Sequence, residues 1–217
     1  MKPRLSNQTN HGLTLVEVLV VIAVLVVVAA LLLPALAAAK RKHSRIGCVE
    51  NLKEIGLAYR VWEGDHGDKY PMGVAVTNGG SMELVLNGNP LMTFLVMSNE
   101  LSTPKILHCP DDTEHIGTYS FGTLVSSNIS YFANIDAAEM YPQMLLSGDD
   151  NFTVGGIPVK SGLLVISSNA PIAWTSARHK YHGNLSLADG SVQQVSQNGL
   201  RQTIQNSGMV TNRLAIP

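Results

Sequence analysis

The sequence predicts an α+β protein in which a long N-terminal helix packs on a head built around an antiparallel sheet. Residues 13–39 form an apolar run, and its only charged member is Glu17. Residues 72–170 instead hold short apolar segments separated by turn-forming Gly, Asn and Pro residues, a pattern typical of short strands and loops. The chain therefore divides into a membrane helix and a folded head.

The apolar run is long enough to cross a bilayer. Its 27 residues would form a helix of roughly 40 Å at about 1.5 Å per residue, whereas a hydrocarbon core is about 30 Å thick. Glu17 is costly there, because a carboxylate at the centre of a spanning helix costs roughly 2.5–3.5 kcal/mol. The run offers no cation to pair with it. A free amine at Leu13, four residues away on the same helix face, would serve if the chain were cut before Leu13.

The segment His11-Gly12-Leu13-Thr14-Leu15-Val16-Glu17 resembles the processing signal of type IV pilins and type II secretion pseudopilins. The resemblance implies that a prepilin peptidase removes a leader at 1–12 by cutting between Gly12 and Leu13 and methylates the new amine. Glu17 then becomes the fifth residue of the mature chain. Pro34 matches the helix-kinking proline of this family, whereas Leu13 stands where phenylalanine is usual.

Two other interpretations of the N-terminus stay open. In the first, the segment is a simple signal anchor and Met1 is retained. In the second, it is a secretory signal cleaved after Ala35-Leu36-Ala37 or Ala37-Ala38-Ala39. Secretory h-regions usually have about 7–15 apolar residues, fewer than this run has. The N-terminal residue of the mature protein distinguishes the three interpretations: Met1, Leu13 or a residue near Lys40.

Charge and cysteine content restrict the classes of partner. The formal net charge is −1, and loss of Lys2 and Arg4 with the leader makes it −3 (−1 − 2), so we expect no nucleic-acid partner. The two cysteines are Cys48 and Cys109. In an exported domain such a pair forms a disulfide more often than a metal site, but two separate buried thiols remain the alternative.

The orientation signals disagree. Four cations follow the span, and by the positive-inside rule they would place the head in the cytoplasm: Lys40, Arg41, Lys42 and Arg45. The resemblance instead implies a single-pass protein of the bacterial inner membrane, with its N-terminus in the cytoplasm and its head in the periplasm. The basic cluster would then contact anionic lipid head groups or acidic surfaces of neighbouring subunits, or form a solvated helix turn.

Helical periodicity continues beyond the span. Apolar residues recur at spacings of three and four up to about Trp62, and Gly64 and Gly67 mark the end. The expected regions are a leader at 1–12, a transmembrane helix at 13–39, an amphipathic continuation at 40–66 and a β-rich extracytoplasmic head at 67–217. A short helix is expected at Leu91–Leu101.

Three further elements narrow the resemblance to a pseudopilin-like group found in planctomycetes and verrucomicrobia. They are Cys48–Ala58 on the helix, Leu107-His108-Cys109-Pro110-Asp111-Asp112, and His179 followed after nine residues by Asp189-Gly190. The last is the His-(nine)-Asp-Gly signature of that group. The resemblance implies a pilin-like fold.

Asp189-Gly190 predicts a hairpin. Asn184–Ala188 and Ser191–Val195 flank a dipeptide that suits a two-residue type I′ turn, which would place Leu187 opposite Val192. His179 is then expected to dock on the hairpin through Asp189 or a backbone carbonyl. The alternatives are a metal or ligand site built from His179, His182 and Asp189, and a contact to another subunit.

A calcium site is a weaker prediction. Asp149, Asp150 and Asn151 occupy an expected loop and could supply oxygen ligands, as the resemblance to calcium-binding major pseudopilins suggests. Their spacing is not that of an EF-hand, and Asp111-Asp112 forms an equally plausible turn. No nucleophile elbow, zinc-protease helix or phosphate-binding glycine loop is present, so we expect a protein without enzymatic activity.

The favoured function is that of a structural subunit of a type II secretion pseudopilus or type IV pilus-like filament, with no certain cofactor. The expected partners are the prepilin peptidase, other pseudopilin subunits of the same or different kind, an inner-membrane assembly platform and the lipid bilayer. Leu13, Glu17 and Pro34 would take part in assembly. The alternative is a membrane-tethered ligand- or carbohydrate-binding module that uses the Gly- and Asn-rich loops and the His179–Asp189 region.

Overall fold

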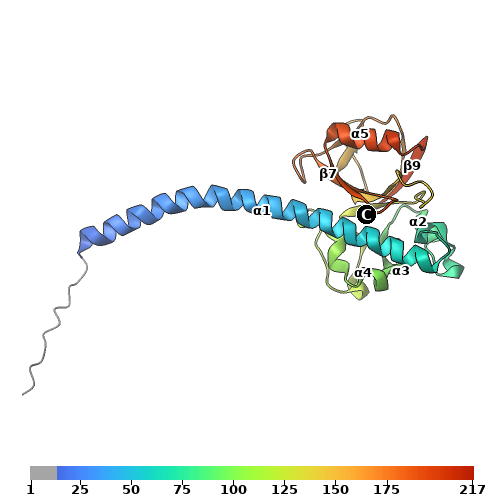
Figure 1. Ribbon diagram of the computed structural model, residues 1–217, viewed down its shortest axis with the longest axis horizontal. Coiled ribbons are helices and arrows are strands. Elements are labelled where there is room, and N and C mark those ends of the chain that lie inside the picture. Colours follow the sequence, from blue (N-terminus) through green and yellow to red (C-terminus); the bar gives the residue numbers. More distant parts are fainter. Residues whose placement is uncertain (1–13) are drawn as a thin grey trace, which may run out of the picture. The chain divides into compact units, whose positions relative to one another are not determined.

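The computed structural model describes residues 14–217, apart from the side chains of residues 37, 38 and 41–43. The chain forms two compact units, residues 1–42 and 43–217. Helix α1 (Leu15–Asp65) belongs to both, because its first part lies in one unit and its second part in the other (Figure 1). The processing residues Gly12 and Leu13 lie outside the described residues.

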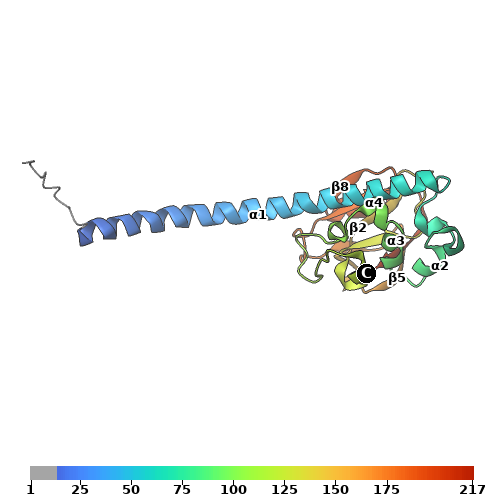
Figure 2. The ribbon, with the colours of Figure 1, turned by 90° about the horizontal axis from the view of Figure 1, so that it is seen from below.

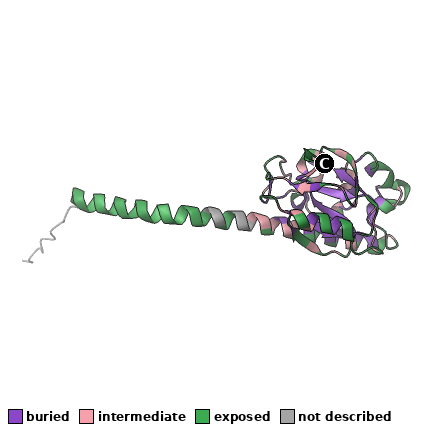
Figure 3. Cartoon of the chain, turned by 90° about the horizontal axis from the view of Figure 1, so that it is seen from above, coloured by how far each residue is buried: buried purple, intermediate pink, exposed green. Residues whose placement is uncertain are grey.

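The first unit contains one apolar helical segment. Leu15–Leu36 comprises 22 residues with a mean hydropathy of 3.3, and none of the residues in its most apolar stretch of 18 is buried (Figure 3). A helix of this length and composition is long enough to cross a bilayer. Pro34 lies inside α1 without ending it.

The second unit is the head, whose main sheet is antiparallel throughout. Six strands are hydrogen-bonded in the order β5-β9-β1-β2-β7-β8, and a second sheet has the order β4-β3-β6. The strands are β1 (Tyr131–Asn134), β2 (Leu145–Asp149), β3 (Phe152–Val154), β4 (Ile157–Pro158), β5 (Gly162–Ser167), β6 (Ile172–Trp174), β7 (Gly183–Leu187), β8 (Val192–Val195) and β9 (Thr211–Ile216). This arrangement confirms the predicted α+β class with a long helix and an antiparallel sheet.

Short helices and turns fill the chain between α1 and the first strand (Figure 2). They are the 3₁₀ turns η1 (Pro71–Gly73), η2 (Val76–Asn78), η3 (Pro104–Leu107), η4 (Phe121–Thr123) and η5 (Ser126–Asn128), and the helices α2 (Met82–Val85), α3 (Leu91–Val96) and α4 (Ser98–Leu101). The single helix expected at Leu91–Leu101 is therefore two helices, with Met97 between them. Helix α5 (Gln197–Asn206) follows β8.

Two hydrophobic cores lie on opposite faces of the main sheet. The first contains the buried face of α1, including Leu52, Ile55 and Tyr59. The second contains Leu200 and Ile204 of α5 together with residues of the small sheet. Adjacent strand residues belong to different cores because side chains alternate across a sheet. The ribbon accordingly shows α1 and α5 on opposite sides of the sheet (Figure 1).

The hairpin between β7 and β8 exists, but its predicted turn is wrong. Ser186, not Leu187, lies opposite Val192, so the loop has three residues, Ala188–Gly190. Only Gly190 has a positive φ, of 83°. The loop is thus the three-residue type in which a left-handed residue closes the turn. Ala188 joins the loop because its N–H donates to the carbonyl of Met144.

Candidate functional site

The three elements of the signature group meet where α1 packs on the head. Cys48 of α1 forms a disulfide with Cys109, which follows η3, and both residues are fully buried. Asn51 Nδ2, one turn further along α1, donates to the carbonyl of His108 at 2.8 Å. The helix is therefore attached to a loop distant in sequence, covalently across 61 residues and by a hydrogen bond across 57 residues.

His179 completes this cluster and does not dock on Asp189. Its Nδ1 lies 3.0 Å from Asp111 Oδ2, and its Nε2 lies 3.4 Å from Asp149 Oδ2 and 3.5 Å from Cys109 Sγ. Asp189 is exposed and accepts a hydrogen bond from the Ser191 N–H instead. The predicted contact to Asp189 is therefore wrong, since the buried imidazole faces two other carboxylates.

The backbone at His179 is left-handed for three consecutive residues. His179, Lys180 and Tyr181 have φ values of 51°, 51° and 64°. This conformation costs roughly 1–2 kcal/mol per non-glycine residue, so surrounding contacts must hold it. Arg45 Nη2 donates to the His179 carbonyl at 2.7 Å, and the His179 N–H donates to Asp111 Oδ2 at 3.1 Å. The strained turn is thereby fixed to α1 and to the cysteine loop.

Arg178 forms a buried ionic cluster next to His179. Its side chain is 2% exposed, and its Nη2 pairs with Asp150 Oδ1 and lies 3.2 Å from Asp112 Oδ2. Nη1 donates to the Ser130 carbonyl at 3.0 Å. Burial alone would raise the pKa of Asp112, but hydrogen bonding from His115 and the charge of Arg178 hold this pKa well below its usual range. Asp112 is therefore ionised and paired at neutral pH.

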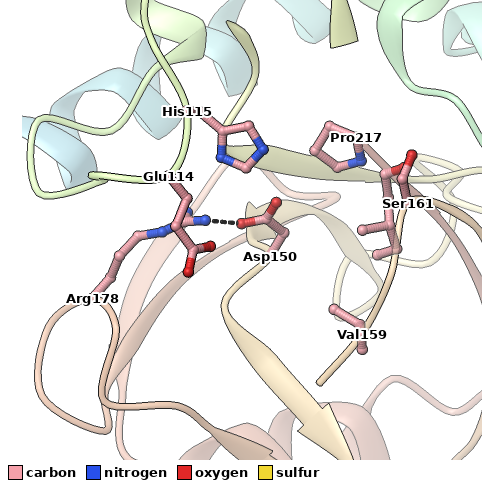
Figure 4. A pocket seen from close by; sticks show the side chains of 8 residues that line it. Glu114, His115, Asp150, Val159, Ser161, Arg178 and Pro217 are labelled. Carbon is pink, nitrogen blue, oxygen red and sulfur yellow. Dashed lines mark hydrogen bonds and ion pairs between the residues drawn. The ribbon is translucent and has the colours of Figure 1, made fainter. Parts of the chain in front are cut away.

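A small cavity of about 210 Å³ lies beside this cluster (Figure 4). It is lined by Glu114, His115, Asp150, Val159, Ser161, Arg178, Ile216 and Pro217. Asp112, His115 and Asp150 bring their ligand atoms within 4.8 Å of one another, a spacing that could hold a metal ion. The Arg178 guanidinium contacts both carboxylates, however, and already supplies the positive charge that the pair requires. The group is better described as an ion-pair network.

The residues predicted to bind calcium have separate partners. Asp149 ends β2 and accepts hydrogen bonds from Asn184, while Asp150 pairs with Arg178, so the loop expected at 148–151 begins only after Asp149. His182, which the alternative metal site would share with His179 and Asp189, has its Nδ1 3.1 Å from the Lys180 carbonyl. Asn151 Nδ2 contacts the Arg178 carbonyl at 3.4 Å. Calcium binding stays a prediction.

The pKa values of His179 and Asp149 shift in opposite directions for the same reason. Burial lowers the pKa of His179 from 6.5 to about 4 and raises that of Asp149 from 3.8 to about 7. In both cases the low-dielectric surroundings disfavour the charged form. Between pH 4 and 6.5 the folded pair thus holds one proton, as do the same two groups in the unfolded chain.

This balance predicts opposite pH dependences for two single variants. In Asp149→Asn, the lowered pKa of His179 is no longer offset, so stability relative to the wild type should fall as the pH drops from 6.5 to 4.5. In His179→Gln, the raised pKa of Asp149 is no longer offset, so stability relative to the wild type should fall as the pH rises over that range. Each slope can reach about 1.4 kcal/mol per pH unit. Urea unfolding at three pH values, compared with the wild type and with His182→Gln, measures both slopes.

If stability relative to the wild type changed with pH in the same direction in both variants, the conclusion that the folded His179–Asp149 pair holds one proton would be contradicted. His182→Gln serves as the control, because this histidine lies outside the buried cluster.

At the other end of α1, Thr14 and Glu17 form a capping box. The Glu17 N–H donates to Thr14 Oγ1 at 3.3 Å, and Glu17 Oε2 accepts hydrogen bonds from the N–H and hydroxyl of Thr14, both at 2.8 Å. Such reciprocal bonds satisfy donors that a helix start leaves free. The carboxylate therefore has a partner within its own chain, which the spacing Thr-x-x-Glu could have indicated.

The junction is the contact of α1 with the cysteine loop and the His179 turn. The roles of three of its residues were missed from the sequence: Arg45, Asp111 and Arg178. Asp111 was noted only as part of a turn and of the signature element that begins at Leu107, and Arg45 only as part of the basic cluster. Arg178 directly precedes His179 and is fixed by acids from two other segments. An arginine next to the signature histidine was the available signal, together with the paired acids at 111–112 and 149–150.

One family model matches the chain. A model described as the prokaryotic N-terminal methylation motif matches residues 7–33. No curated protein and no solved structure matches the chain. The matched segment contains Thr14 and Glu17 and most of the apolar segment Leu15–Leu36.

Proposed function

We propose that this chain is a type IV pilin-like or pseudopilin precursor and a structural subunit of a type II secretion pseudopilus or a related pilus-like filament, because its residues 7–33 match the prokaryotic N-terminal methylation motif. A prepilin peptidase would cut between Gly12 and Leu13, and α1 would then carry the subunit into the filament. The observation that carries this proposal is the coincidence of the methylation motif at 7–33 with an exposed apolar helix that begins at Leu15.

The capping box supports a specific role for Glu17. A carboxylate in an apolar span needs hydrogen-bond donors or a cation to stabilise it. Thr14 supplies two donors, its backbone N–H and its hydroxyl. Cleavage before Leu13 would create an ammonium one residue before Thr14. The same amine on an adjacent subunit could pair with Glu17, which would favour transfer of the span from lipid to a filament core. Other subunits and an inner-membrane assembly platform are the partners that this mechanism requires.

The disulfide supports a head on the oxidising side of the membrane. Disulfides persist in the periplasm and are rare in the cytosol, where thiols are kept reduced. The Cys48–Cys109 bond therefore favours the orientation with the leader in the cytoplasm and the head in the periplasm. The positive charges that follow the span would then lie near the outer surface of the inner membrane.

The test compares Glu17→Leu with Thr14→Ala and the apolar control Val16→Leu. Glu17→Leu should insert and be processed normally, because it makes the span more apolar, but it should assemble poorly. Thr14→Ala removes one hydroxyl donor and keeps the carboxylate, so it should assemble better than Glu17→Leu. Assembly is measured by crosslinking two cysteines placed in the membrane at Val24 and Val26, on opposite faces of the helix, so that each subunit can link to two neighbours and a filament gives a ladder of multimers.

Normal multimer ladders for Glu17→Leu would contradict the pairing of Glu17 with a neighbouring amine. Absence of a ladder in the otherwise unaltered chain, when processing is normal, would contradict the filament itself and favour a tethered module. Equal defects in Glu17→Leu and Thr14→Ala would reduce the role of Glu17 to capping its own helix.

A further inference from the structure

The disulfide and His179 together place three zinc-type ligand atoms in one buried position. The two Sγ atoms of Cys48 and Cys109 and a ring nitrogen of His179 lie within 4.8 Å of one another, and all three residues are buried. Two thiolates and an imidazole are a common ligand set for structural zinc, which is usually four-coordinate and tetrahedral. The bond between the sulfurs excludes this use in the oxidised protein, so the question concerns the dithiol form.

Two distances measured from His179 Nε2 suit a tetrahedral ion. With zinc bonds of about 2.3 Å to sulfur and 2.0–2.1 Å to nitrogen or oxygen, neighbouring ligands lie about 3.6 Å apart for S···N and about 3.3 Å apart for N···O. Cys109 Sγ is 3.5 Å from His179 Nε2, and Asp149 Oδ2 is 3.4 Å from the same nitrogen. The two sulfurs, once unbonded, would have to move apart, and the Asp149 carboxylate, which lies outside the group of ligand atoms within 4.8 Å of one another, would have to move toward them.

A fourth ligand and an orienting partner are both at hand. Asp149 is fully buried, and its Oδ1 has no hydrogen-bond partner among residues 14–217. An unpaired buried carboxylate oxygen is costly, and a bound cation would satisfy it. On the other side of the ring, His179 Nδ1 lies 3.0 Å from Asp111 Oδ2. Metal-ligating histidines commonly have a carboxylate beside their second nitrogen, and here Nδ1 lies near Asp111 without an aligned hydrogen bond, so Nε2 is the nitrogen that faces the sulfur.

We propose that reduction of the Cys48–Cys109 disulfide converts this cluster into a site for one zinc ion, with Cys48, Cys109, His179 and Asp149 as ligands. A dithiol reductant gives up two electrons and two protons and becomes a disulfide, while the Cys48–Cys109 bond opens to two thiols. Zinc then replaces the two thiol protons, which pass to solvent. The disulfide and the zinc ion are thus alternative cross-links: the disulfide joins α1 to the cysteine loop, and the zinc ion would join both of them to the His179 turn.

The experiment measures zinc in the full, untagged chain held in detergent micelles. One sample is oxidised, and the other is reduced with dithiothreitol and desalted without oxygen. Both are incubated with zinc chloride and dialysed, and zinc per chain is measured by atomic absorption. The reduced wild type should retain about one zinc ion per chain and the oxidised wild type none. His179→Gln should lose most of the zinc, whereas His182→Gln, which changes a histidine outside the site, should keep it.

Cobalt substitution decides the case if His179→Gln does not fold. Reduced wild type loaded with cobalt should show thiolate-to-cobalt charge transfer and the visible bands of a tetrahedral ion. A reduced wild type that retains no zinc would overturn the proposal. Equal zinc in the oxidised and reduced forms, or a cobalt spectrum without thiolate charge transfer, would show adventitious surface binding and would overturn it as well.

Discussion

Replacing Arg178 by methionine is expected to lower the free energy of unfolding of the head by about 3–5 kcal/mol, the usual cost of removing one partner from a buried ion pair. The Arg178 side chain is 2% exposed, and the side chains of Asp112 and Asp150 are 0% and 7% exposed. Without the guanidinium, two neighbouring carboxylates would remain buried with little compensation. Methionine preserves most of the side-chain volume, so the expected loss is electrostatic.

Urea unfolding of the full chain in micelles, followed by tryptophan fluorescence, measures this effect. Trp62 and Trp174 are both buried and belong to the two different cores, so both faces of the sheet are observed. Lys160→Met is the matched control, because it removes an exposed cation and should change stability by less than about 0.5 kcal/mol. A loss below 1 kcal/mol for Arg178→Met would contradict a buried, mutually dependent cluster.

Local pattern was sufficient to predict the helix and its long apolar segment. An uninterrupted apolar run and a period of three to four residues depend only on neighbours in sequence, and α1 follows them from Leu15 to Asp65. The hairpin strands were predictable for the same reason. Their turn was not, because the N–H groups of Ala188 and Asp189 donate to the carbonyls of Met144 and Pro142, which are distant in sequence.

The sheet order required non-local information. The C-terminal strand β9 lies between β5 and β1, so it pairs with segments about 50 and 80 residues earlier. No periodicity within Thr211–Ile216 indicates those partners. Amphipathic spacing of Leu200 and Ile204, after the N-cap Ser196, could have predicted α5.

The junction cluster was only partly predictable because its polar residues are buried. Acidic and basic residues are usually exposed, so adjacent acids such as Asp149 and Asp150 were assigned to a loop. In the structure Asp149 contacts His179 and Asn184, whereas Asp150 contacts Arg178. Sequence indicated that His179 and the cysteines matter, but only the fold brings Cys109 Sγ within 3.5 Å of His179 Nε2.

Removing the disulfide with Cys48→Ala and Cys109→Ala together is expected to destabilise the head by about 4 kcal/mol. The bond closes a loop between residues 61 positions apart, and restricting such a loop in the unfolded chain is worth about that amount in the chain-entropy model. This loss of stability arises because the unfolded chain without the bond has more conformations. Reducing the disulfide of the wild type in the presence of a zinc chelator should therefore cause a similar loss. Urea unfolding of both forms, with oxidised wild type as reference, measures it.

The comparison of these two forms separates chain entropy from packing. The reduced wild type keeps both sulfur atoms beside His179, whereas the double alanine variant also loses two buried side-chain atoms. If the chain-entropy account holds, most of the loss appears already in the reduced wild type, and the alanine variant adds only the smaller cost of the cavities. A reduced wild type as stable as the oxidised one would contradict it, since α1 would then be held to the sheet by Arg45, Asn51 and the hydrophobic core without help from the bond.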